Sequence, residues 1–158
     1  AIADIKSLNP NSDLMLVSPD AGAISKIYKL GTGIQVLESA KHRDHTGKLK
    51  GFSVPLKTED ANKILIWVDD LCDAGGTFIG EAEEADKQGH KSKKYLVVSH
   101  GVFSKGFIDL EKHFDYIYTT NSYEDYNNMW FEAYQYYNEG HIPRVKITNV
   151  YNIENYNV

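Results

Sequence analysis

The sequence predicts an α/β fold with a mainly parallel sheet flanked by helices. Continuous apolar runs, typical of strands covered on both faces, alternate along the chain with segments of helical spacing. Most runs end in residues that favour turns. The 158 residues and the hydrophobic content of 42% fit one globular domain with a buried core. We therefore expect a single domain over residues 1–158.

The first strand and helix are predicted close to the start of the chain. The apolar run in residues 13–20 stops at Ser-Pro-Asp, where proline cannot donate to a ladder. Residues 21–31 then show helical spacing, with Gly31 as a C-terminal cap. The residues on the predicted buried face are Ile24, Ile27, Tyr28 and Leu30.

The later elements follow from the same criteria. Further strands are predicted at 33–39, 63–70, 95–101 and 116–120. Further helices are predicted at 77–90, 104–113 and 122–140, and the second of these three is short. The helix at 77–90 is expected to bury Phe78, Ala82 and Ala85. Residues 40–62 are polar and basic without either periodicity, so we expect a long loop or flap there.

Composition argues against several classes of protein. Cys72 is the single cysteine, which excludes an intrachain disulfide and a four-cysteine zinc site and indicates a reducing, cytoplasmic compartment. The net charge of −5 argues against a nucleic-acid footprint spread over the surface. Because the sequence shows neither a membrane-spanning run nor a targeting segment, we expect no membrane partner.

The stretch KILIWVDDLCDAGGTF carries the strongest chemical signal. Its apolar run brings Asp69 and Asp70 to the edge of the sheet, and residues 73–77 form the turn into a helix. Free N–H groups at a helix start bind phosphate, and glycines let the phosphate approach closely. Carboxylates repel phosphate but accept hydrogen bonds from sugar hydroxyls or bind a divalent cation. The stretch therefore predicts a sugar-phosphate site; the alternative is that both acids merely cap a turn.

Four motifs together resemble a known enzyme family. VDDLCDAGGT is similar to the ribose-phosphate-binding signature of type I phosphoribosyltransferases. Three further stretches resemble the carboxyl-terminal half of the ribose-phosphate diphosphokinases, also called phosphoribosyl pyrophosphate synthetases. They are VSPDAGA at 17–23, Lys41-His42-Arg43 in the place of a catalytic flexible loop, and SHGVFSKG at 99–106. The resemblance covers residues 13 to about 121.

The resemblance implies a type I phosphoribosyltransferase-like fold with a flexible catalytic loop, and an activity. Members make phosphoribosyl pyrophosphate and AMP from ATP and ribose 5-phosphate. By this likeness Asp20 would hold Mg²⁺, while Lys41 and Arg43 would act on the diphosphoryl group in transfer. The implied substrate-binding residues are Asp69 and Asp70 for the ribose hydroxyls and Asp73, Ala74, Gly75, Gly76 and Thr77 around the 5-phosphate.

The chain also departs from the family pattern. Ala23 replaces a glycine of the family's SPDAGG segment, Ala74 stands where threonine is common, and 122–140 resembles a helical insertion. The family's amino-terminal half, which supplies most of the ATP site, has no counterpart here. We therefore expect a fragment, or a half that pairs with an amino-terminal half or forms a homo-oligomer. Alternatives are a phosphoribosyltransferase that consumes phosphoribosyl pyrophosphate to make a nucleotide, and a non-catalytic regulatory subunit that binds a sugar phosphate.

Two further groups are given structural roles. His42, His45 and His100 make a poor zinc cage, since two of them lie on one loop without an acid or thiol nearby. We expect His100 to support the ligand site from the end of its strand. Cys72 lies beside the acids without an activating histidine next to it, so we expect an inert loop or core residue.

Overall fold

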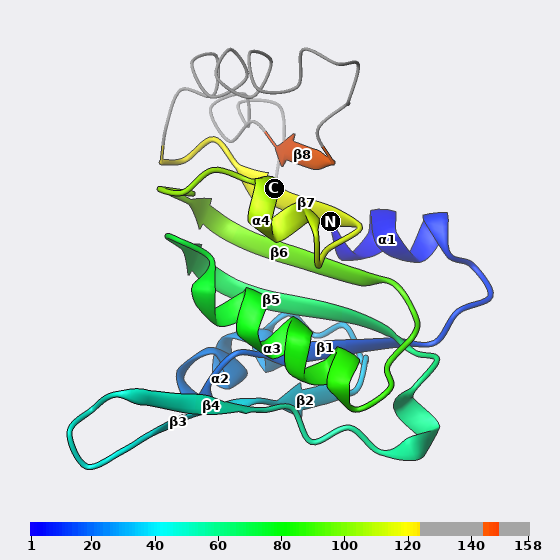
Figure 1. Cartoon of the computed structure of the whole chain (residues 1–158). Coiled ribbons are helices and arrows are strands. Elements are labelled where there is room, and N and C mark those ends of the chain that lie inside the picture. Colours follow the sequence, from blue (N-terminus) through cyan, green and yellow to red (C-terminus); the bar gives the residue numbers. More distant parts are fainter. Residues whose placement is uncertain (124–143, 149–158) are drawn as a thin grey trace.

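A computed structural model describes residues 1–123 and 144–148. Six strands form one sheet: β1 (Leu14–Ser18), β2 (Val36–Glu38), β5 (Ile64–Cys72), β6 (Lys94–Gly101), β7 (Tyr116–Thr120) and β8 (Val145–Thr148). Their order is β2-β1-β5-β6-β7-β8, and every neighbouring pair is parallel (Figure 1). The predicted fold class is confirmed.

Helices flank this sheet. Those within the described residues are α1 (Ile2–Leu8), α2 (Ala21–Lys29), the short 3₁₀ helix η1 (Thr58–Asp60), α3 (Gly76–Lys87) and α4 (Ile108–Glu111). The sequence did not indicate α1, whose seven residues are too few to show helical periodicity. Nearly all of the helix predicted at 122–140 lies outside the described residues. No helix in the described part of the chain is both long and apolar enough to cross a lipid bilayer.

Apolar side chains cover both faces of the sheet, as continuous strand runs require. On the side of α3, Trp67 of β5 meets Phe114 edge to face, with ring centroids 5.5 Å apart. The predicted inward face of α3 is confirmed, because Phe78, Ala82 and Ala85 are buried. On the other side lie Ile5 of α1 and, from α2, Ala23 and Ile27.

The predicted buried face of α2 is partly wrong. Ile27 is buried, but Tyr28 and Leu30 are 64% and 52% exposed. The helix lays Ala23 and Ile27, one turn apart, on the sheet. Tyr28 lies roughly 100° further round the helix than Ile27 and therefore faces solvent.

Residues 40–53 form a hairpin, so the prediction of a long loop is wrong there. β3 (Ala40–Arg43) pairs antiparallel with β4 (Leu49–Ser53). Asp44 fastens the turn, because its carboxylate accepts hydrogen bonds from the N–H (2.9 Å) and hydroxyl (2.6 Å) of Thr46. Most of the hairpin residues are exposed, and without a fully buried face the strands need no alternating pattern.

Contacts of α1 tie the start of the chain to the far edge of the sheet. One carboxylate oxygen of Asp4 accepts hydrogen bonds from the Tyr118 hydroxyl of β7 and the Lys146 ammonium of β8, both at 2.8 Å. The edge strand β8 is therefore held by a side-chain contact as well as by its ladder with β7.

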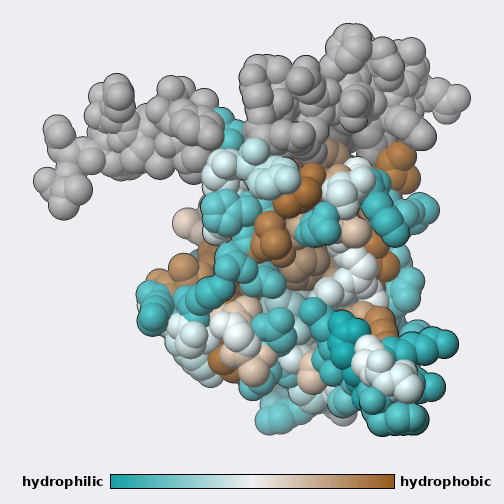
Figure 2. Space-filling model, turned by 90° about the vertical axis from the view of Figure 1, so that its left-hand side faces the viewer, coloured by the Kyte–Doolittle hydropathy of each residue, from teal (hydrophilic) through white to brown (hydrophobic). Residues whose placement is uncertain are grey.

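The strand order changes direction between β1 and β5. The chain leaves β1 toward β2 on one side, whereas it leaves β5 toward β6 on the other. In open parallel sheets such a switch point opens a crevice at the carboxyl ends of the strands. Figure 2 shows the side of the molecule toward which the arrowheads of β5 and β6 point in Figure 1, with hydrophobic surface surrounded by hydrophilic residues.

Candidate functional site

The turn from β5 into α3 presents backbone N–H groups at the switch point. Residues 73–75 form this turn, and Gly75 takes a left-handed conformation with φ of +77°. The Ile79 N–H donates the first helical hydrogen bond, to the Gly75 carbonyl (3.0 Å). The N–H groups of the first turn before it have no acceptor within an α-helix and carry the positive end of its dipole, which suits an anion.

The structure requires glycine at position 75 for packing and conformation, but not at position 76. A Cβ on Gly75 would lie 2.9 Å from Cδ2 of Leu110, and its φ is one that side chains rarely adopt. Packing and conformation therefore both require glycine there. A Cβ on Gly76 would meet no atom within 4 Å, and Gly76 is exposed. The open space at Gly76 lies where a bound anion would approach the backbone.

A cleft of about 340 Å³ lies beside this turn. Its lining residues are Lys41, Asp69, Leu71, Asp73, Ala74, Gly75, Gly76, Thr77 and Phe78. The structure thus brings the predicted phosphate loop together with one predicted acid and one predicted cation. Lys41 reaches the cleft from β3, far from the loop in sequence.

The second acid, Asp70, pairs with a lysine that the sequence analysis missed. The ammonium of Lys26 on α2 donates to the Asp70 carboxylate. This hydrogen bond lowers the pKa of Asp70 and raises the pKa of Lys26. Lys26, Asp69 and Asp70 all line a smaller hollow of about 110 Å³. Asp69 therefore borders both the cleft and this hollow.

Asp69 has an unusual protonation equilibrium. Burial raises its pKa to about 6, and the neighbouring Asp70 carboxylate adds to the effect. The N–H of Asp70 donates to Asp69 Oδ1 (2.8 Å), which opposes the shift. Around pH 6 the carboxyl can therefore either donate a hydrogen bond to a sugar hydroxyl or accept one.

Asp20 and Arg43 lie outside the cleft lining. Asp20 follows β1 and caps α2, with Oδ1 accepting from the Ala23 N–H (3.0 Å). Arg43 is exposed and donates through Nη1 to the Gly47 carbonyl (2.9 Å) at the hairpin turn. Since β1 and β5 are neighbours, Asp20 still lies at the same edge of the sheet as Asp69.

Asp20 fits a magnesium ion only as part of a larger set of ligands. Among the described residues, no three histidine, cysteine or acidic side chains gather closely enough to hold a metal. Mg²⁺ is commonly held by one or two carboxylates, with water and substrate phosphates completing the coordination. The exposed Asp20 carboxylate suits that mode of binding, in which the metal arrives with its phosphate ligand.

Packing explains why the SHGVF segment contains a glycine two residues before a phenylalanine. A Cβ on Gly101 would lie 1.9 Å from Cε2 of Phe103, so the Phe103 ring rests on the glycine. Phe103 has a φ of +46° and packs against Phe107, with centroids 4.6 Å apart. His100 does not line the cleft; its Nδ1 shares a hydrogen bond with the Ser122 hydroxyl (2.6 Å).

Two side chains near the cleft are fully buried, and the sequence predicted only one of them. Cys72 is fully buried, and burial raises the pKa of its thiol to about 12, which confirms an inert core residue. Glu81, which we did not predict as a core residue, is also fully buried and accepts a hydrogen bond from the Trp67 indole (2.8 Å). The available signal was its place three residues after Phe78, on the inward face of α3.

Comparison with known proteins agrees with the motifs. The chain is 34% identical over 119 residues to the ribose-phosphate pyrophosphokinase of Mycoplasmopsis pulmonis. It is 31% identical over 107 residues to that of Agrobacterium fabrum. The chain is a homologue of the ribose-phosphate pyrophosphokinases. These matches cover 70% and 66% of the chain but only 36% and 34% of the two enzymes, so the chain spans about a third of the length of such relatives.

Solved structures support the fold of this ribose-phosphate pyrophosphokinase homologue. Phosphoribosylpyrophosphate synthetase from Mycobacterium smegmatis superposes with a TM-score of 0.68 at 20% identity, covering 94% of this chain and 44% of that one. The APRTase from Giardia lamblia matches with a TM-score of 0.50 at 11% identity, covering 75% of this chain and 73% of that one. The fold is type I phosphoribosyltransferase-like. No family model matches the chain.

Proposed function

We propose that the chain is the ribose 5-phosphate-binding part of a ribose-phosphate pyrophosphokinase and corresponds to its carboxyl-terminal half. The observation that carries this proposal is the cleft in which Lys41, Asp69 and the turn at 73–77 converge. The identity to enzymes of that name supports the choice of substrate.

Each part of the cleft has a chemical task in this proposal. The N–H groups at the start of α3 and the Thr77 hydroxyl bind the 5-phosphate, with Gly76 leaving room for it. Asp69 and Asp70 accept hydrogen bonds from the ribose hydroxyls. Lys26 keeps Asp70 ionised and therefore able to accept.

Diphosphoryl transfer from ATP would proceed at the same edge of the sheet and yield phosphoribosyl pyrophosphate and AMP. Such transfers depend mainly on positioning and on neutralising phosphate charge. Lys41 supplies positive charge in the cleft, and Arg43 would have to turn from Gly47 to contribute. Asp20 would hold Mg²⁺, which shields the phosphate oxygens. A region corresponding to the amino-terminal half would supply the remaining ATP contacts.

Calorimetric titration of the chain with ribose 5-phosphate tests the binding site. We expect Asp70→Asn and Thr77→Ala each to weaken binding by about 1–3 kcal/mol, the usual effect of leaving a polar group unpaired. Thr58→Ala, at an exposed position of η1 outside the cleft, is the matched control and should bind as the unaltered chain does. Unchanged affinity in both cleft variants would refute the site.

An assay of AMP release from ATP separates the possible roles. The assay is run with ribose 5-phosphate and Mg²⁺, with and without an amino-terminal half from a relative. Release that needs the Thr77 hydroxyl supports the pyrophosphokinase. Binding without turnover in every mixture would instead favour a regulatory subunit. Turnover of phosphoribosyl pyrophosphate with a nucleobase, without AMP release, would favour a phosphoribosyltransferase.

A further inference from the structure

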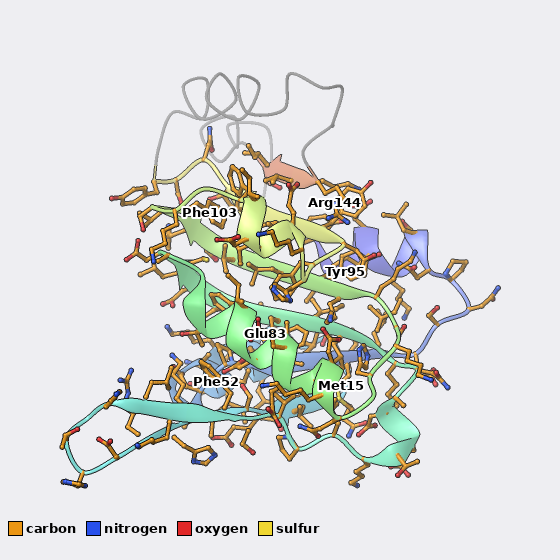
Figure 3. The ribbon with its side chains drawn as sticks, in the orientation of Figure 1. Met15, Phe52, Glu83, Tyr95, Phe103 and Arg144 are labelled. Atoms are coloured by element: carbon orange, nitrogen blue, oxygen red, sulfur yellow. The ribbon has the colours of Figure 1, made fainter. Side chains whose placement is uncertain are left out.

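An aromatic ring of the hairpin packs against α3. Phe52 of β4 is half-buried, although most of the hairpin is exposed. A Cβ placed on Gly80 of α3 would lie 2.0 Å from Cε2 of Phe52 and 2.6 Å from Cδ2 and Cζ. The ring therefore lies directly against the helix backbone, and Figure 3 shows Phe52 between the hairpin and α3.

Glycine at position 80 is explained by this contact. Gly80 lies inside α3 without a positive φ, so the helix itself does not require glycine there. A glycine in a helix interior is less favourable than alanine. Any side chain would displace the Phe52 ring, because the overlap involves several ring atoms.

The same ring is coupled to the cation of the cleft. In the antiparallel register, Phe52 is the direct cross-strand partner of Lys41. Side chains of such partners project from the same face of a two-stranded sheet. Gly80 lies one helical turn beyond Gly76 in the phosphate-binding turn. The contact of Phe52 with Gly80 therefore links the strand pair that carries Lys41 to the helix that begins at that turn.

We propose that Phe52 and Gly80 are positioning residues. The packing of the Phe52 ring on Gly80 holds Lys41 beside the phosphate-binding turn. The role of Lys41 rests on the proposed function; the docking of the hairpin does not. Among the described elements, α3 is the main neighbour of β4 beyond its own hairpin partner. Without the contact between Phe52 and Gly80, Lys41 would lie on a hairpin that is not fixed to α3. Ordering the lysine when a ligand binds would then cost conformational entropy and reduce the affinity for that ligand.

A distance measurement tests the docking without any ligand. Spin labels are attached at His45→Cys in the hairpin and Lys87→Cys in α3, since the native Cys72 is buried and unreactive. We expect one narrow distance distribution in the parent chain and a broad one in both Gly80→Ala and Phe52→Ala. Unchanged distributions in both variants would overturn the docking, and two variants guard against a folding defect in one of them.

Gly51→Ala is the matched control. This glycine precedes Phe52 in β4, and a Cβ there would meet no atom within 4 Å. Its distance distribution should equal that of the parent chain. A broadening as large as in Gly80→Ala would show that any substitution loosens the hairpin, and would overturn the assigned contact.

A double-mutant cycle tests whether the contact acts through Lys41. Because Lys41 lines the same cleft as the phosphate-binding turn, its charge should also attract the 5-phosphate, and we expect Gly80→Ala to weaken ribose 5-phosphate binding at least about fivefold. In a Lys41→Ala background the same substitution should cause no further loss. Equal losses in both backgrounds would overturn the positioning role. A parent chain that fails to bind ribose 5-phosphate would reject the proposed function and the role of Lys41 with it, while the distance measurement alone decides the docking.

Discussion

The indole Nε1 of Trp67 donates a hydrogen bond of 2.8 Å to Oε2 of Glu81, and both side chains are fully buried between β5 and α3. The other oxygen, Oε1, is buried and accepts no hydrogen bond from the described residues. The Ser39 hydroxyl lies near the carboxyl but donates to the Ser18 carbonyl (2.8 Å). Burial therefore dominates and raises the pKa of Glu81 to about 7.

This glutamate makes the stability of the chain depend on pH. Its pKa is higher in the folded state than the ordinary value of 4.5, so the folded chain binds the proton more tightly. The contribution of Glu81 to the free energy of unfolding should fall between pH 4.5 and 7, by about 3 kcal/mol in all. Glu81→Gln should remove this part of the slope. Urea unfolding at pH 5 and pH 8 measures it.

Glu84→Gln serves as the control for that measurement. Glu84 lies on the same helix but is only half-buried, where it pairs with Lys87. This variant should keep the pH dependence of the parent chain. If Glu81→Gln keeps it as well, the raised pKa is wrong.

The two glycines of the turn should separate stability from binding. Gly75→Ala should destabilise the chain by about 1–3 kcal/mol, because its Cβ overlaps Leu110 and its φ is unfavourable. Gly76→Ala should leave the melting temperature nearly unchanged but weaken ribose 5-phosphate binding by about 1.4 kcal/mol or more, a factor of ten. Thermal unfolding and calorimetry on both variants decide. Normal binding by Gly76→Ala would mean that the phosphate lies elsewhere.

Binding of ribose 5-phosphate should respond to the protonation of Asp69. Because burial places the pKa of Asp69 at about 6, the carboxyl becomes a full acceptor for sugar hydroxyls only above that pH. The phosphate group of the ligand titrates in the same range. The ratio of affinities between the parent chain and Asp69→Asn removes that common effect. It should rise from pH 5 to pH 7; a constant ratio would exclude Asp69 from the site.

Gly101 is predicted to be essential for packing. Gly101→Ala should destabilise the chain by about 1–3 kcal/mol, since its Cβ would overlap the Phe103 ring. Gly51→Ala, with open space around its Cβ, should be close to neutral. Chemical denaturation of both variants tests the difference. Equal stabilities would show that the Phe103 ring can move aside without loss.

The sequence predicted five of the six strands of the described sheet because each is a short apolar run; β8, where Lys146 interrupts the apolar residues, was not predicted. Buried parallel strands such as β5 need apolar residues on both faces, and this pattern is local. The hairpin was missed because neither of its faces is fully buried, so its strands need no alternation of apolar and polar residues. Its one local signal was the Asp44–Gly47 turn.

The site was predictable where it is contiguous in the chain. The turn at 73–77 and Asp69 lie close together in the sequence, so their convergence follows from one strand and the helix after it. The pairing of Lys26 with Asp70 and the contact of Phe52 with Gly80 join distant segments. Such contacts depend on how α2 and the hairpin sit against β5 and α3, which spacing along one sequence does not contain.

The Asp4 carboxylate, which accepts two hydrogen bonds, connects the first helix to strands formed by residues far along the sequence. That carboxylate accepts hydrogen bonds from Tyr118 of β7 and Lys146 of β8, so α1 helps to hold the outermost of the described strands in place. Removing the opening residues would therefore remove the side-chain contact that links β8 to the start of the chain, and β8 would depend more on its ladder with β7.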